Sequence, residues 1–154
     1  MIAIIRSLLA VSIGTIAGWV VIFLVQNISS GMYSLPAGVD VSTPEALARA
    51  MSLLPIGAFL MVLLSYAAGS AVGGAVAARI APRARIGHAV VVGLLLTLVG
   101  LINLSYFRHP TWFIVVNVPE FVVFAWLGAV VATRLGRASR PPGPDQPDTA
   151  FEGV

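Results

Sequence analysis

Four stretches of the chain are long and almost wholly apolar, and the polar residues gather between them. The stretches cover residues 3–25, 53–78, 87–107 and 111–133. A helix of about 20 mostly apolar residues crosses the ~30 Å hydrocarbon layer of a bilayer with every backbone N–H and C=O bonded inside the segment. Short connections make consecutive spans antiparallel neighbours. The pattern therefore predicts an all-α fold, an up-and-down four-helix transmembrane bundle within residues 1–138.

The longest connection, residues 26–52, carries a helical signal of its own near its end. Ser42 and Glu45 have the spacing of a capping box, and Pro44 suits the first turn of a helix. The apolar residues that follow share one helical face, which predicts a short amphipathic helix lying on the membrane surface. This helix is either a plain connector or a lid over a cavity in the bundle.

The composition points to lipid as the surroundings of this chain and argues against nucleic acid as a partner. Hydrophobic residues make up 58% of the chain and charged residues only 10%, whereas soluble proteins carry about 25% charged residues. The basic residues stand singly or in small groups beside the apolar stretches, as membrane-flanking charges do. All of them are arginine, and with the abundant alanine, glycine and valine they indicate a GC-rich bacterial genome. We expect the lipid bilayer of a bacterial inner (cytoplasmic) membrane as the partner of the spans.

The arginines also predict the orientation of the spans, because arginine is enriched on the cytoplasmic side of a membrane. Most of them flank the same ends of the four stretches, so we expect both termini in the cytoplasm and residues 26–52 outside. Residues 139–154 are rich in proline and poor in apolar residues, which predicts a disordered cytoplasmic tail. The arginines on the expected cytoplasmic side are Arg6, Arg79, Arg83, Arg85, Arg134, Arg137 and Arg140, against Arg49 and Arg108 outside.

Glycines recur at four-residue spacing in the first two stretches. Gly14 and Gly18 form one GxxxG motif, Gly69 and Gly73 form another, and Gly74 extends the second. Lipid gives helices no hydrophobic attraction for one another, so small residues that allow close backbone approach drive their association. We expect tight packing within one chain at these positions. Self-association into a homo-oligomer, or association with other membrane proteins, is the alternative.

The strongest candidate for chemistry is Glu120, which is the one acidic residue inside a predicted span. A charge at the centre of a membrane helix costs about 2.5–3.5 kcal/mol on insertion scales, so this carboxyl group must be paired, protonated or open to a water-filled cavity. Pro119 lacks the N–H that would bond to the carbonyl of Val115, which predicts a kink at this depth. A broken helix beside an acid is a recurring transporter site. A structural kink, with Glu120 satisfied by a neighbour such as Tyr66, is the equal alternative.

Two asparagines lie at matching depths in the third and fourth predicted spans. Asn103 and Asn117 both fall nearer the outer face than Glu120 does. An amide pair bridging the two helices is the economical interpretation, and such bonds average about 0.6 kcal/mol in membranes. The sharper interpretation joins both amides to Glu120 in a polar vestibule that faces outward.

Metal and cofactor chemistry find no support in the residue pattern. The chain has no cysteine, which excludes thiolate metal sites and disulfides. His88 and His109 flank opposite ends of the third span, so they cannot share a metal ion. No hydrolase constellation and no glycine-rich phosphate loop is present. We therefore expect no metal and no cofactor.

Several short motifs are shared with a group of small bacterial membrane proteins. The chain resembles this group of four-span proteins, which carries no established activity, over residues 1–137. The resemblance implies the four-span topology and a bacterial inner membrane, and it implies no functional residue. The motifs are Leu35-Pro36-Ala37-Gly38, Pro44-Glu45, Leu53-Leu54-Pro55, Gly73-Gly74, Gly87-His88-Ala89, Ile102-Asn103-Leu104 and His109-Pro110-Thr111-Trp112-Phe113.

Three functional hypotheses follow from these residues. The first is a non-enzymatic membrane-associated or accessory protein, which the glycine motifs and the lack of a catalytic constellation favour. The second is a small transporter, channel or proton-linked carrier that uses Glu120 at the Pro119 kink. The third, an enzyme acting on a lipid or quinone, has the least support, because the reactive side chains are not clustered in the sequence. We expect no enzymatic activity.

Overall fold

The computed structural model describes residues 1–35, 38–106 and 110–138, and within them all regular secondary structure is helical. Four of the helices are long and apolar enough to cross a membrane. The predicted all-α bundle, with four spans and a short helix in the first connection, is therefore confirmed. The predicted tail, Arg108 and His109 lie outside the described residues. The helices are α1 (Ile2–Met32), α2 (Pro44–Ser52), α3 (Ile56–Ile80), α4 (Arg85–Tyr106) and α5 (Thr111–Ala138).

The four long helices expose most of their large apolar side chains on the outside of the bundle. On α1, Ile16 is 63% exposed and Leu24 is 55% exposed. The largest apolar patch on a soluble monomer is about 300–600 Å², whereas here apolar side chains surround the helices on nearly every outward face. Only a bilayer covers such a surface without cost. The chain is an integral membrane protein with four spans.

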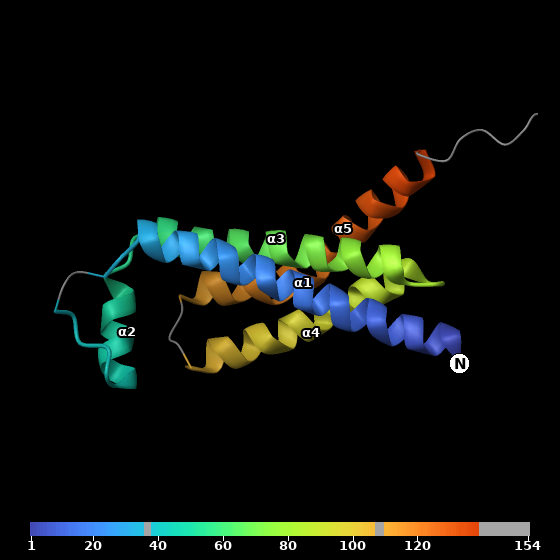
Figure 1. Ribbon diagram of the computed structural model, residues 1–154. Coiled ribbons are helices and arrows are strands. Elements are labelled where there is room, and N and C mark those ends of the chain that lie inside the picture. Colours follow the sequence, from blue (N-terminus) through green and yellow to red (C-terminus); the bar gives the residue numbers. More distant parts are fainter. Residues whose placement is uncertain (36–37, 107–109, 139–154) are drawn as a thin grey trace, which may run out of the picture.

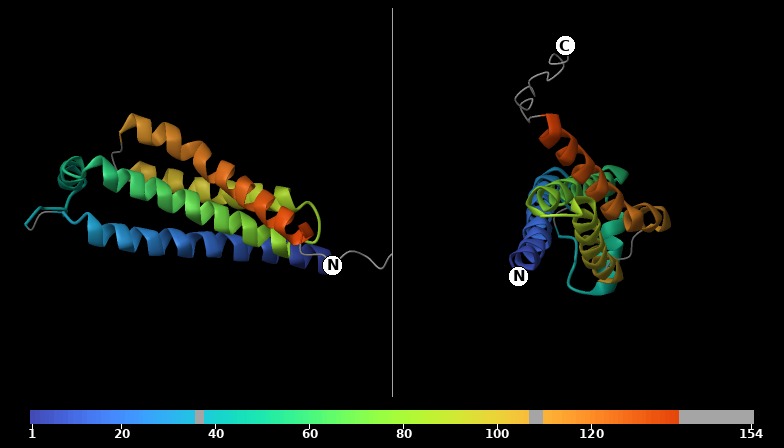
Figure 2. Two further views of the ribbon diagram at one scale, coloured as in Figure 1. Left: turned by 90° about the horizontal axis from the view of Figure 1, so that it is seen from above. Right: turned by 90° about the vertical axis from the view of Figure 1, so that its right-hand side faces the viewer.

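Helix α3 is the centre of the bundle. Figure 2 shows α3 between α1 and α5, and α3 contacts α1, α4 and α5. Helix α4 in turn contacts α1, α3 and α5. Consecutive spans therefore pack against one another, as short connections require. The amino terminus lies at the end of the bundle opposite α2 (Figure 1).

Helix α1 is longer than the first apolar stretch indicates. The predicted span ends at residue 25, but the helix continues to Met32 and includes Gln26. The polar residues of this extension bond to their own backbone: Asn27 Nδ2 donates to the Phe23 carbonyl at 2.8 Å, and Ser30 Oγ donates to the Asn27 carbonyl at 2.9 Å. At 1.5 Å per residue the helix is about 46 Å long, well beyond the ~30 Å hydrocarbon layer. Hydropathy marks the apolar part of a helix and does not report helical hydrogen bonding, so the predicted span does not give the end of α1.

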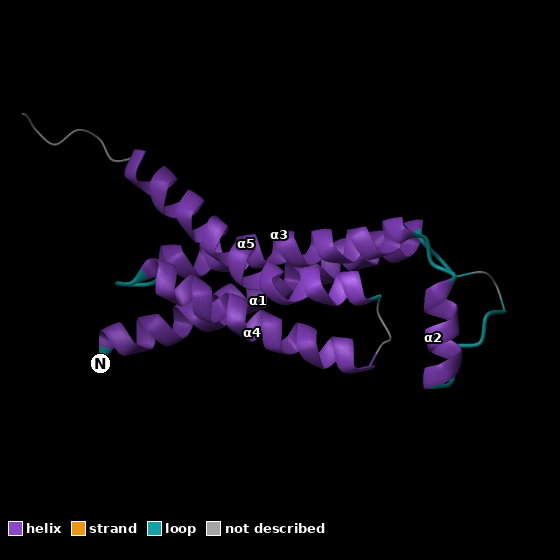
Figure 3. Ribbon diagram, turned by 180° about the vertical axis from the view of Figure 1, so that it is seen from behind, coloured by secondary structure: helices purple, strands orange, loops and turns teal. Residues whose placement is uncertain are grey.

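Helix α2 lies across the end of the bundle (Figure 3), with its axis at a wide angle to the four spans. An amphipathic helix at the boundary of a bilayer adopts this orientation. Its Ala46 and Ala50 are buried, while Glu45 and Arg49 are exposed. Residues of α2 line a hollow together with Phe59 of α3 and with Pro110, which precedes α5.

The cap of α2 differs from the predicted capping box. Thr43, and not Ser42, is the N-cap residue, and its hydroxyl accepts a hydrogen bond from the Ala46 N–H at 3.1 Å. Ser42 instead donates its backbone N–H to the Asp40 carboxylate at 2.8 Å. Hydrogen bonds from the Ser42 side chain and backbone hold the pKa of Asp40 below its usual value. With the helix beginning one residue later, the third helical residue is alanine, which cannot return a bond to the cap.

The two GxxxG motifs meet at the α1–α3 contact. A Cβ atom added to Gly14 would lie 2.8 Å from the Gly73 carbonyl oxygen, and one added to Gly18 would lie 2.8 Å from the Gly69 carbonyl oxygen. Real Cβ atoms essentially never come this close to another atom. Each helix therefore presents a groove of bare backbone to the other, and the two axes approach more closely than larger residues would allow.

The α3–α5 contact is equally close. A Cβ atom on Gly74 would overlap the backbone of Ala125, and one on Gly128 would overlap the backbone of Ala71. The two contacts lie one helical turn apart on each helix, so α3 and α5 cross at this point. Helix α3 thus uses Gly69 and Gly73 towards α1 and Gly74 towards α5, which explains why it is the central span.

Candidate functional site

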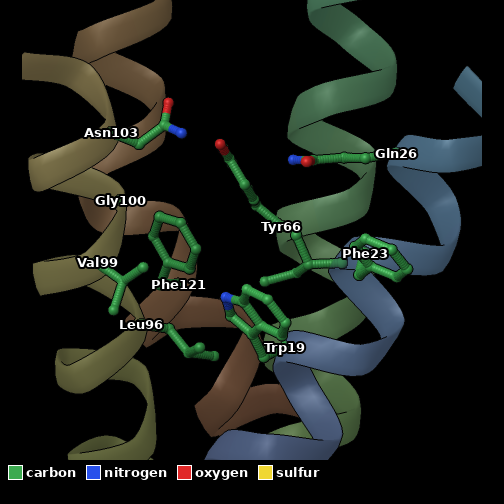
Figure 4. Close-up of a pocket in the computed structure, with 10 residues that line it drawn as sticks. Trp19, Phe23, Gln26, Tyr66, Leu96, Val99, Gly100, Asn103 and Phe121 are labelled. Atoms are coloured by element: carbon green, nitrogen blue, oxygen red, sulfur yellow. The ribbon is translucent and has the colours of Figure 1, made fainter. Parts of the chain in front are cut away.

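A cavity of about 220 Å³ opens between α1 and α4. The two helices separate towards the end of the bundle that carries α2 (Figure 1). Side chains of α3 and α5 form the floor of the space between them. We name this cavity the α1–α4 cleft. Its lining consists of Trp19, Ile22, Phe23, Gln26, Tyr66, Leu96, Val99, Gly100, Asn103 and Phe121 (Figure 4).

Three uncharged polar side chains meet at one end of the cleft. Figure 4 shows the Tyr66 hydroxyl of α3 directed between Gln26 of α1 and Asn103 of α4. Gln26 Nε2 also donates to Ser65 Oγ at 3.4 Å, and Ser65 Oγ donates to the Val62 carbonyl at 2.6 Å. The three side chains together offer N–H and O–H donors and carbonyl acceptors without a charge.

The remainder of the cleft is apolar and aromatic. The Tyr66 ring packs on the Phe121 ring with a centroid distance of 4.9 Å. At the rim, Trp19 is 54% exposed and Phe23 is 55% exposed, and their rings stack with centroids 6.1 Å apart. Val99 on the α4 side is 46% exposed. The cleft therefore opens sideways towards the acyl chains of the bilayer.

Glu120 and Asn117 are buried but do not line the cleft. Glu120 is 8% exposed and its Oε2 atom is buried without a hydrogen-bond partner. Its carboxyl group is near enough to Tyr66 for an electrostatic interaction. Asn117 is 1% exposed and its Nδ2 atom also lacks a partner. Among the predicted site residues, the structure thus joins Tyr66 and Asn103 at the cleft and leaves Glu120 and Asn117 outside its lining.

The predicted amide pair between Asn103 and Asn117 does not form through the Asn117 amide nitrogen, which has no partner. Asn117 Oδ1 faces Gly100, where an added Cβ atom would lie 3.6 Å from it. Asn103 is exposed and lies nearly one turn further along α4. Matching depth is not sufficient for an amide pair, because Asn117 is buried near Gly100 whereas Asn103 is exposed at the cleft.

Pro119 lies within α5, and the helix continues on both sides of it. Pro119 and Val115 are both exposed, so the carbonyl freed by the proline belongs to the outward face of α5. Glu120 is one residue further round the helix and is buried. The proline and the acid therefore face different surroundings, and the freed carbonyl is not part of the cleft.

Gln26 is the polar cleft residue that sequence reasoning missed. It was assigned to the connection after the first span, because the apolar run ends at Val25. The structure extends α1 past it, and Gln26 then falls seven residues after Trp19, on the same helical face. The seven-residue spacing of Trp19 and Gln26 is the signal in the sequence that could have placed Gln26 in the site.

The end of the bundle opposite α2 is basic, and its described residues form no comparable arrangement. Arg6 donates to the Ile80 carbonyl at 3.4 Å, which ties the start of α1 to the end of α3. Arg83 and Arg85 flank a shallow hollow before α4 and are exposed. His88 Nδ1 lies 3.1 Å from the Ala84 carbonyl oxygen. Within the described residues, no group of three or more metal-ligating side chains occurs.

Comparison of the chain with family models, with curated proteins and with solved structures finds no match. The site must therefore be interpreted from its own geometry. That geometry is a sideways opening in a four-span bundle, with uncharged hydrogen-bonding groups at one end and aromatic and aliphatic side chains at the other.

Proposed function

We propose that this protein is a non-enzymatic accessory protein of a bacterial inner membrane that holds an amphiphilic molecule from the bilayer in the α1–α4 cleft. The observation that carries the proposal is the division of the cleft lining: Gln26, Tyr66 and Asn103 supply polar groups at one end, and the rest is apolar. Ligand sites have this character, mostly apolar with a few converging polar groups. An amphiphile satisfies both parts at once.

The chemistry of the lining supports binding more than catalysis. Within the described residues, the titratable side chain that lines the cleft is Tyr66, and no acid or imidazole lines the cleft with it. Nucleophilic or acid–base catalysis needs such a partner within hydrogen-bond reach. Glu120 interacts with Tyr66 electrostatically but contributes no atom to the lining. The cleft is therefore suited to holding a molecule unchanged.

A proton-linked carrier is the second candidate, and one observation favours it. Glu120 is buried with its Oε2 atom unpaired, and intramembrane acids commonly mark proton or ion pathways. A carrier also requires a route for substrate to the acid. The cleft reaches Tyr66 but does not include Glu120, so the geometry favours the binding function.

The proposed orientation, with both termini in the cytoplasm, rests on the arginines at the end opposite α2. The chain has no cysteine, so single cysteines can report accessibility without background. We expect a membrane-impermeant maleimide to label Ser34→Cys in intact bacterial cells, and to label Ala84→Cys only after the cells are lysed. Both positions are exposed and outside the helices. Labelling in the reverse pattern contradicts the orientation.

The binding function predicts that filling the cleft expels the ligand. Val99 lines the cleft and is about half exposed, so Val99→Phe adds a ring to the cleft without disturbing a tight contact. We expect the amount of native amphiphile that stays with the protein through detergent washing to fall about tenfold, equivalent to about 1.4 kcal/mol of binding free energy. Mass spectrometry of extracted lipid per protein chain measures this.

Leu98→Phe is the matched control for that experiment. Leu98 is the preceding residue on α4, is 56% exposed, and lies outside the cleft lining. A phenylalanine ring at position 98 contacts only the bilayer, so we expect the amount of retained amphiphile to stay at the wild-type level. Equal retention in Val99→Phe and wild type would remove the cleft from consideration as the binding site.

A further inference from the structure

We infer that the occupant of the α1–α4 cleft is an uncharged lipid with a hydroxyl-bearing head, of the diacylglycerol type, held with its head at Gln26, Tyr66 and Asn103. This inference rests on the proposed binding function and adds the chemical class and direction of the ligand. Charge, hydrogen-bonding capacity and dimensions of the cleft each contribute to it.

The lining favours a head without charge. Among the described residues that line the cleft, none is an arginine, aspartate or glutamate, and Glu120 interacts with its polar end electrostatically, through Tyr66. An anionic phosphate placed there would leave water, and none of the described lining residues is a cation that could pair with it, which is unfavourable in a low-dielectric site. Arg49 lies on α2 and lines a separate hollow with Asp40. A phospholipid head is therefore disfavoured.

The hydrogen-bonding groups favour a head that donates as well as accepts. The amides of Gln26 and Asn103 each carry a carbonyl acceptor and N–H donors, and the Tyr66 hydroxyl can do either. A quinone offers only carbonyl acceptors, so it gives the amide oxygens of Gln26 and Asn103 no hydrogen-bond donor. A hydroxyl with neighbouring ester carbonyls, as in diacylglycerol, can satisfy both kinds of group.

The dimensions of the cleft indicate which part of the lipid lies inside it and where the acyl chains leave. Trp19 to Gln26 on α1, and Leu96 to Asn103 on α4, each span seven residues, or about 10 Å of helix. The cavity of about 220 Å³ is smaller than the ~300–1,000 Å³ of sites that enclose a whole small molecule. A head and the first part of its chains fit, and the chains leave between Trp19 and Val99 into the bilayer.

Trp19 at the rim provides the test. A protein with Trp112→Phe and Trp126→Phe keeps Trp19 as its sole tryptophan, and brominated acyl chains quench a tryptophan that they contact. In detergent micelles we expect saturable quenching by a dibrominated diacylglycerol, at a concentration about tenfold below that of a phosphatidylglycerol with the same chains. A short-chain benzoquinone, which quenches directly, is the third probe and should act only at still higher concentration.

Tyr66→Phe tests the hydrogen bond to the head, because it removes one oxygen from the cleft and keeps the ring on Phe121. We expect the half-saturating diacylglycerol concentration to rise about 2–10-fold, the range that one net hydrogen bond supports. Tyr33→Phe is the matched control, since the Tyr33 hydroxyl lies against Gly57 and away from the cleft. That variant should bind like the parent.

The outcomes separate this inference from the proposed function. Saturable binding of phosphatidylglycerol at equal or lower concentration overturns the uncharged head and keeps the binding site. Tightest binding by the benzoquinone overturns the hydroxyl requirement and also keeps the site. If none of the three probes quenches Trp19 saturably while the unfolding curve of the protein is normal, both the ligand class and the proposed binding function fail.

Discussion

Gly128→Leu is expected to abolish the folded bundle, with a loss of stability of at least about 3 kcal/mol. A Cβ atom at Gly128 would overlap the backbone of Ala71, and backbone atoms cannot rotate aside as a side chain can. Overpacking a core with flexible neighbours costs about 1–3 kcal/mol, so a leucine against backbone should cost more. Unfolding by increasing SDS in mixed micelles, followed by circular dichroism, measures the loss.

Gly136→Leu is the control on the same helix. A Cβ atom there has no neighbour within 4 Å, so leucine meets open space and should leave the unfolding midpoint unchanged. The pair separates loss of a close helix contact from the general effect of a leucine in α5. A Gly128→Leu protein that unfolds like wild type would mean that α3 and α5 do not pack backbone to backbone.

Glu120→Met is expected to stabilise the protein by about 1–3 kcal/mol. The Oε2 atom of Glu120 is buried without a partner, and an unsatisfied buried polar atom carries a penalty of this size. Methionine has a similar length and no polar group to desolvate, and replacing buried charged groups by apolar residues of similar volume is often stabilising. The same SDS titration measures the change.

Glu120→Gln separates the structural and transport interpretations of this acid. The amide group that replaces the carboxyl group is still buried and polar. The stability of the Glu120→Gln protein should therefore stay close to that of wild type and below that of Glu120→Met. In proteoliposomes carrying a pH gradient, wild type and Glu120→Gln should be equally inactive in proton flux. A proton flux that the wild type supports and that Glu120→Gln abolishes would favour the carrier function. A loss of stability in Glu120→Met would also favour it.

The fold could be predicted because its determinants are long and repetitive. About 20 apolar residues in succession specify a membrane span whatever their order, and a capping residue with proline marks the start of α2 to within one position. The end of α1 could not be predicted from hydropathy. The side chains of Asn27 and Ser30 donate hydrogen bonds to the helix backbone, and hydropathy does not report such bonds.

The candidate site could be predicted only in part, because it depends on which faces of the helices meet. Tyr66 and Asn103 were identified as intramembrane polar residues, and the structure places both at the cleft. Glu120 and Asn117 are buried in the bundle, but neither lines the cleft. Gln26 lies in the site because α1 continues beyond its apolar run. Helix rotation and crossing decide these placements, and the length of an apolar run specifies neither of them.

The central place of α3 has a consequence for the order in which the protein is assembled. Helices α1 and α3 join through their four glycines, and both have been synthesised once residue 80 has entered the membrane. Helix α5 adds later, on the far side of α3 (Figure 2). The first two spans can therefore form a hairpin while the ribosome is still translating the rest, and this hairpin then serves as the template on which the last two spans dock.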